Sequence, residues 1–195
     1  MRPQWTTRQL SSHGAGEDRL AVWLEGETLV VVVCDGAGGI PGGGRAADLA
    51  MAGLIRGLPG DAEALLTALD HHLLDDAFAG ESTAVVAVVT GAGVVGASCG
   101  DSTALLDGVE LTGGQHKKRR LGSGRALPVR FSGSGSRLLV CTDGLSSVVR
   151  GEQVAAAMSK RSLQRAAQAL TEAARLPSGK LVDDLAFVLV DIGSR

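Results

Sequence analysis

Short apolar runs, each bounded by glycine or by acidic residues, constrain the fold of this chain more than any other feature of its sequence. The runs are rich in valine, leucine and alanine, and they predict strands over 19–24, 28–34, 83–89, 94–99, 104–106, 137–141 and 185–191. Most neighbouring runs are joined by short glycine-rich turns. Such turns favour antiparallel pairing over a parallel βαβ repeat.

Helical patterns lie between groups of these strands. They predict helices over 45–58, 61–79 and 152–175. We expect Asp61 to cap the second helix, whose apolar stripe includes Leu74 and Phe78, and Ser162 to restart the third after a break. The fold class expected is α+β, a four-layer αββα sandwich in which two antiparallel β-sheets are flanked by helices. We expect a single domain over residues 1–195.

Charge and hydropathy exclude several classes of protein. The formal net charge of -2 argues against nucleic-acid binding, and the basic run Lys117–Arg120 is interpreted as a solvated loop. The apolar run Leu29–Cys34 is far shorter than the roughly 20 residues that span a membrane, so we expect a cytoplasmic protein. Cys34, Cys99 and Cys141 lie far apart, which predicts reduced thiols in the core.

Acidic residues stand where the predicted strands begin or end. They are Asp35, Asp101, Asp143, Asp183 and Asp184. Adjacent strands are about 4.8 Å apart, so acids at their ends can converge. A cluster of carboxylates is stable mainly when cations occupy it, and oxygen ligands without histidine or cysteine suit Mg²⁺ or Mn²⁺. The alternative is that each Asp-Gly pair is merely a turn.

Six sequence blocks in order resemble the metal-dependent protein phosphatases of type 2C. Residues 13–191 contain these blocks, which read SHGAGEDRLAV, VVVCDGAGGIPGGGRAA, GESTAVVAVV, VVGASCGDSTALL, RLLVCTDGLSSVV and VDDLAFVLVDI. Each block alone is a weak signal, whereas six in the family's order are specific. The resemblance implies a compact, bacterial-like member of that family.

The resemblance also implies a set of metal ligands. Asp35 would bridge two Mn²⁺ or Mg²⁺ ions, and the Gly36 carbonyl would bind one of them. Asp143 and Asp183 would complete the protein ligands of the first ion, and Glu17 would serve the second. Two ions close together lower the pKa of a bridging water and hold the phosphoryl oxygens for in-line attack.

Three further acids have supporting roles in that family. Asp101 would belong to a looser third metal site. Asp184 would be secondary, and Asp18 would support the centre from behind its ligands. The candidate catalytic residues are therefore Asp35, Asp143 and His13.

The chain departs from the family pattern at several positions. His13 stands four residues before Glu17, where the family carries an arginine that grips the substrate phosphate. A cationic histidine can take part of that role, although a surface histidine without function is an equal alternative. Ile40 replaces a histidine of the bacterial pattern. Only 41 residues separate Asp101 from Asp143, which leaves little room for a mobile flap.

Two functions follow from these observations. The first is a serine/threonine protein phosphatase whose partners are a phosphorylated protein substrate and a cognate serine/threonine kinase, with neither nucleic acid nor a membrane. The second is a catalytically silent relative that binds a kinase or another phosphoprotein as a regulatory module. Retention of Asp35, Asp143 and Asp183 favours the enzyme, because a silent relative has no physical need for a repulsive cluster of acids.

Overall fold

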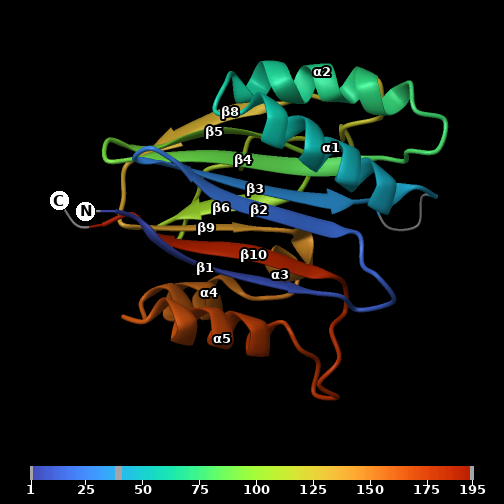
Figure 1. Cartoon of the computed structure of the whole chain (residues 1–195). Helices are drawn as coiled ribbons and strands as arrows, with labels where there is room; N and C mark the ends of the chain where they lie inside the picture. Colours follow the sequence, from blue (N-terminus) through green and yellow to red (C-terminus); the bar gives the residue numbers. More distant parts are fainter. Residues whose placement is uncertain (1, 38–40, 194–195) are drawn as a thin grey trace.

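Two five-stranded antiparallel sheets lie face to face between two layers of helices in the computed structural model, which describes residues 2–37 and 41–193 (Figure 1). The β3 sheet has the strand order β2 (Asp18–Glu25), β3 (Thr28–Gly36), β4 (Ser82–Thr90), β5 (Gly93–Cys99) and β8 (Val129–Gly133). The β9 sheet has the order β1 (Gln4–Leu10), β10 (Leu185–Asp191), β9 (Arg137–Cys141), β6 (Thr103–Leu106) and β7 (Val109–Glu110). The predicted four-layer sandwich is therefore confirmed.

The helices cover the outer faces of the two sheets. On the β3 sheet lie α1 (Gly43–Gly57) and α2 (Ala62–Leu74), and on the β9 sheet lie α4 (Gly151–Met158) and α5 (Leu163–Ala173), with the short α3 (Asp143–Ser146) after β9 (Figure 1). The predicted caps are confirmed, because Asp61 accepts backbone hydrogen bonds at the start of α2 and Ser162 accepts one at the start of α5. Within the described ranges, no helix combines the length and apolar character that crossing a membrane requires.

Strand β3 shows why its valine run folds as a doubly buried strand. Its side chains alternate between two cores. Those facing the helices are Val30, Val32 and Cys34, and those between the sheets are Leu29, Val31 and Val33. All six are fully buried, so both faces of the strand need apolar residues.

The structure corrects the prediction for the second helix. It ends at Leu74 instead of residue 79, and Leu74 and Phe78 are 53% and 79% exposed. The reason is Asp76, whose Oδ1 accepts the backbone N–H of Phe78 at 3.0 Å and whose other oxygen pairs with Arg45 of α1 at 2.6 Å. A short polar side chain thus replaces the next helical turn with a local bend.

The three cysteines are free and buried, as predicted. Burial raises the pKa of Cys99 and of Cys141 to about 12, so both thiols stay protonated and unreactive near neutral pH.

Candidate metal centre

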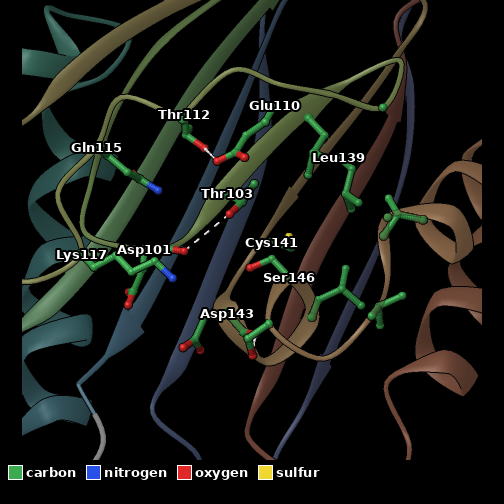
Figure 2. Close-up of a pocket in the computed structure, with 18 residues that line it drawn as sticks. Asp101, Thr103, Glu110, Thr112, Gln115, Lys117, Leu139, Cys141, Asp143 and Ser146 are labelled. Atoms are coloured by element: carbon green, nitrogen blue, oxygen red, sulfur yellow. Dashed lines mark hydrogen bonds between the residues drawn. The ribbon is translucent and has the colours of Figure 1, made fainter.

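Carboxylates from both sheets meet at one end of the sandwich. Asp35 lies near the end of β3, Asp101 follows β5, and Asp143 begins α3 just after β9. One oxygen atom from each of these three carboxylates lies within 4.8 Å of the other two. Figure 2 shows Asp101 and Asp143 at the same end of a cavity. We call Asp35, Asp101 and Asp143 the acid triad.

Two glycines allow close packing directly behind these acids. A Cβ atom on Gly36 would lie 2.4 Å from the backbone of Gly43 at the start of α1. One on Gly144 would lie 1.8 Å from the carbonyl oxygen of Asp184. Neither glycine has a positive φ. The glycine after Asp35 and the one after Asp143 are therefore required by contacts between elements, and a simple turn does not explain them.

Burial and repulsion between carboxylates raise the pKa values of Asp35 and Asp143. The pKa of Asp35 rises to about 9, first because burial removes water from the carboxylate and then because Asp18 and Asp143 carry like charges nearby. The pKa of Asp143 is raised by burial and by the charges of Asp101 and Asp183. In the absence of a cation, Asp35 therefore holds a proton at neutral pH.

The donor set of the triad fits a hard divalent cation. Carboxylate oxygens are the ligands that Mg²⁺ and Mn²⁺ prefer, and the group contains neither histidine nor cysteine. A bound cation favours the ionised carboxylates, so it opposes the repulsion that raises the pKa values of Asp35 and Asp143. Asp101, which the resemblance assigns to a looser third site, lies in this tight group together with Asp35 and Asp143.

Asp18 lies behind the triad. It pairs with Asp35 across β2 and β3, and it is only 3% exposed. Burial raises the pKa of Asp18 to about 7, although the hydroxyl of Thr142, which donates to Asp18 Oδ2 at 2.8 Å, acts in the opposite direction. This place fits the supporting role that the resemblance implies.

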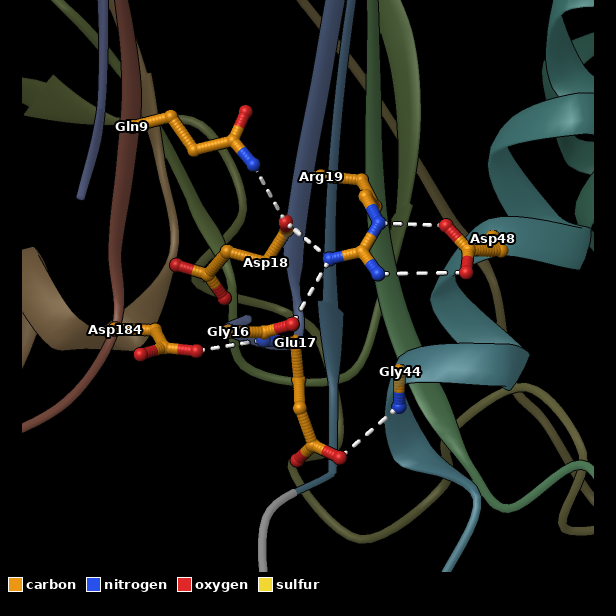
Figure 3. A network of polar contacts seen from close by, with 8 residues as sticks. All are labelled: Gln9, Gly16, Glu17, Asp18, Arg19, Gly44, Asp48 and Asp184. Carbon is orange, nitrogen blue, oxygen red and sulfur yellow. Dashed lines mark hydrogen bonds and ion pairs between the residues drawn. The ribbon is translucent and has the colours of Figure 1, made fainter. Parts of the chain in front are cut away.

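Asp184 binds the loop between β1 and β2 (Figure 3). Its Oδ1 accepts the backbone N–H of Ser12 at 2.7 Å, and its Oδ2 accepts that of Glu17 at 2.6 Å. Burial acts against these bonds, but they lower the pKa of Asp184. The neighbouring Asp183 is exposed and acts on Asp143 through its charge. Asp184 thus joins the segment before β10 to the loop between β1 and β2 through hydrogen bonds. A ligand role for Asp183 stays a prediction.

Glu17 lies just before β2, outside the acid triad, and its side chain reaches the amino end of α1. Its Oε1 accepts the backbone N–H of Gly44 at 3.0 Å (Figure 3). A carboxylate is favourable at the amino end of a helix. The neighbouring Arg19 pairs with Asp48 of α1 at 2.6 Å and fixes β2 against the same helix. Glu17 is therefore held in one orientation at the edge of the site.

His13 lies exposed on the loop that Asp184 binds. Its Nδ1 is 3.2 Å from the hydroxyl oxygen of Ser12, and its carbonyl accepts the N–H of Gly16. A contact between His13 and substrate phosphate stays a prediction. Ile40, which replaces a family histidine, lies outside the described residues.

Arg120 is the residue that sequence reasoning missed. The sequence predicts a solvated loop for Lys117–Arg120, yet Arg120 is only about a quarter exposed and turns toward the acids. Its Nη2 lies 3.7 Å from Asp101 Oδ2, and its Nη1 lies 3.8 Å from Glu81 Oε2. Leu121 is the sequence feature that indicates this inward turn, because an apolar residue directly after a basic run marks the point where the chain enters the core. Leu121 is fully buried in the structure.

Comparison with known proteins finds solved structures that share the fold of this chain. No family model matches the sequence, and no curated protein matches it significantly. A bacterial serine phosphatase matches with a TM-score of 0.79 and 19% identity over 100% of this chain and 99% of the other. The serine/threonine phosphatase Stp1 from Staphylococcus aureus matches with a TM-score of 0.76 and 19% identity over 98% and 95% of the two chains.

A third similar structure is that of RsbX in complex with magnesium. Its TM-score is 0.76 at 15% identity, over 97% of this chain and 94% of that one. At these identities the likeness concerns the fold. The chain therefore has the fold of the compact bacterial serine/threonine phosphatases of type 2C, as the resemblance of its six sequence blocks predicts.

Proposed function

We propose that this chain is a metal-dependent serine/threonine protein phosphatase that hydrolyses phosphoserine and phosphothreonine with two Mn²⁺ or Mg²⁺ ions. The acid triad is the observation that carries the proposal. Its carboxylates are close, partly buried and mutually repulsive, which is costly for a protein that uses them only for structure. The proposed partners are a phosphorylated protein and its cognate kinase in the cytoplasm.

The chain supplies ligands and charge to this reaction. The ligands proposed for the ions are Glu17, Asp35, the Gly36 carbonyl, Asp101, Asp143 and Asp183. When bound, such ions lower the pKa of a coordinated water and neutralise the phosphoryl oxygens. Asp35 must lose its proton when a cation binds, so metal affinity rises with pH. Arg120 adds positive charge on the side of Asp101.

The test is hydrolysis of p-nitrophenyl phosphate and of phosphoserine and phosphothreonine peptides with Mn²⁺ or Mg²⁺. We expect activity that chelation abolishes. Asp35→Asn and Asp143→Asn should each lose more than the roughly 10- to 100-fold that substitutions of the outer partners of metal ligands cost. Asp75→Asn, at the exposed end of α2, is the matched control and should retain full activity.

Two outcomes would contradict the proposal in different ways. Activity that survives both chelation and Asp35→Asn would show that hydrolysis uses another site. Inactivity of the folded chain with every divalent metal would favour the alternative, a silent regulatory module that binds a kinase or a phosphoprotein.

A further inference from the structure

A cavity of about 370 Å³ adjoins the acid triad (Figure 2). It lies between the β6–β7 hairpin, with the loop that follows it, and the segment from α3 to α4. Asp101 and Asp143 line one end, so the cavity is continuous with the candidate metal centre. Its volume is within the range of about 300 to 1,000 Å³ that is usual for ligand pockets.

The cavity has an apolar wall and a polar edge. The wall is formed by β6, β9 and the α3–α4 segment, through Leu105, Leu139, Leu145, Val149 and Val154. The polar edge comes from β7 and the loop after it, through Glu110, Thr112, Gln115 and Lys117 (Figure 2). An apolar wall with a few polar groups at its edge is typical of a site that selects a side chain.

Gln115 has an acceptor that the protein itself does not use. Its Nε2 donates to the carbonyl of Ser102 at 2.6 Å, which fixes the orientation of the amide. Its Oε1 is buried and has no hydrogen-bond partner among the residues that the structure describes. A buried acceptor of this kind is costly unless a donor arrives. Because this oxygen is enclosed, Gln115 contributes a fixed polar edge to the cavity and no open acceptor.

The position of the cavity indicates what fills it. A phosphorylated residue held at the acid triad must carry its neighbours past Asp101 or Asp143. Successive residues of an extended chain advance about 3.3 Å, so side chains a few residues from the phosphate come within reach of the apolar wall. Burial of such a side chain against the accessible surface of Leu105 and Val149 is favourable.

We propose, on the basis of the phosphatase function proposed above, that this cavity is a specificity subsite for an aliphatic side chain near the phosphorylated residue of the substrate. The side chain belongs to one of the roughly three residues on either side of the phosphoserine or phosphothreonine. The preferred substrate is therefore a phosphoprotein segment with leucine, isoleucine or valine close to the phosphate.

A scan of phosphopeptides tests this subsite. Leucine is moved through the three positions on each side of phosphothreonine in an otherwise alanine and serine peptide, and kcat/KM is measured with Mn²⁺. We expect one position at which leucine raises kcat/KM about tenfold over alanine, whereas aspartate at that position gives no gain. Fluorescence anisotropy of the labelled leucine and alanine peptides measures binding without turnover and should show the same order.

A variant that fills the cavity gives the decisive comparison. Gly151 begins α4 and lines the cavity, and a Cβ atom there meets nothing within 4 Å, so Gly151→Phe adds an aromatic side chain to the lining with no clash at its Cβ atom. It should reduce the leucine-to-alanine ratio to about one. Gly91→Phe, in the β4–β5 turn with an equally open Cβ position and outside the cavity, should retain the ratio. Val154→Ala removes two methyl groups from the lining and enlarges the cavity. This variant should therefore shift the preferred substrate residue from leucine toward phenylalanine.

The failures of the two proposals are distinguishable. No hydrolysis of p-nitrophenyl phosphate with any metal overturns the phosphatase function, and equal anisotropy of the two peptides then overturns the subsite as well. Hydrolysis with equal kcat/KM for every peptide overturns the subsite alone. A leucine preference that survives in a folded Gly151→Phe protein also overturns it.

Discussion

The buried Asp70 of α2 and the partly buried Asp35 of β3 have opposite surroundings. Asp70 is 4% exposed, and its oxygens accept three backbone hydrogen bonds at 2.8 to 3.0 Å, from Gly122, Gly124 and Ala126. Asp35 instead faces other carboxylates, and burial and these charges raise its pKa to about 9.

The difference shows that burial alone does not mark a functional acid. Backbone N–H groups stabilise the charge of Asp70 by donating hydrogen bonds to it, and these bonds hold the loop that follows Arg120 in place. The acid triad receives no comparable set of donors among the described residues, so a cation is its natural partner. A buried acid is thus a candidate ligand when other acids, and not N–H groups, surround it.

The largest effect that separates the two acids is on stability without metal. Asp70→Ala leaves three backbone N–H groups unpaired and should lower the free energy of unfolding by about 3 kcal/mol. Asp35→Asn removes a carboxyl that must take up a proton when the chain folds, so it should raise the free energy of unfolding. Urea unfolding in the presence of chelator measures both, with Asp75→Asn as the neutral control. Equal destabilisation by both substitutions would remove the distinction.

A smaller effect is the pH dependence of the metal-free protein. Between the ordinary carboxyl pKa near 3.9 and about 9, folded Asp35 retains a proton that the unfolded chain has lost. The unfolded state binds fewer protons, so the free energy of unfolding should fall as pH rises through this window. Asp18 contributes to this fall in stability up to about pH 7. The fall between about pH 7 and 9 comes from Asp35, so Asp35→Asn should remove it.

Thermal melting from pH 5 to 9 with chelator checks this dependence. Saturating Mn²⁺ should flatten it, because the ion takes the place of the protons. A melting temperature that rises with pH in the presence of chelator would mean that the triad is not repulsive.

The smallest expected effect concerns His13. If its charge meets substrate phosphate, His13→Arg should lower KM and His13→Ala should raise it, each about two- to fivefold, as for one exposed charge. Arginine keeps its positive charge at pH 6 and at pH 8, so the gain of the arginine variant should be present at both. Phosphopeptide kinetics at pH 6 and 8 measure this effect. Three indistinguishable profiles would exclude His13 from the site.

The sequence predicted the fold best where local pattern and final environment agree. The valine run of β3 is apolar because both of its faces are buried. Strand β1 was missed because its residues QWTTRQL show no apolar run, and only pairing with β10 makes them a strand. The end of α2 depends on the pair between Arg45 and Asp76, which lie far apart in sequence.

The residues of the candidate site also fall into those that a local sequence pattern predicts and those that depend on distant contacts. The positions of Asp35 and Asp143 follow from the strands that precede them. The place of Asp101 in the tight group depends on how two sheets meet, and the inward turn of Arg120 depends on the burial of Leu121. Neither arrangement is visible in a local pattern.

The position of β10 has a consequence for the synthesis of this protein. This strand lies between β1 and β9, and its register joins Gln4 to Asp191. When residues 1–143 of a nascent chain have left the ribosome, all three acids of the triad are outside it, but β10 is not yet available to join β1 to β9. Asp184, which binds the loop before β2, is also still missing. Contacts so distant in sequence form late. The end of the sandwich that carries the acid triad is therefore completed only after residues 184–191 leave the ribosome.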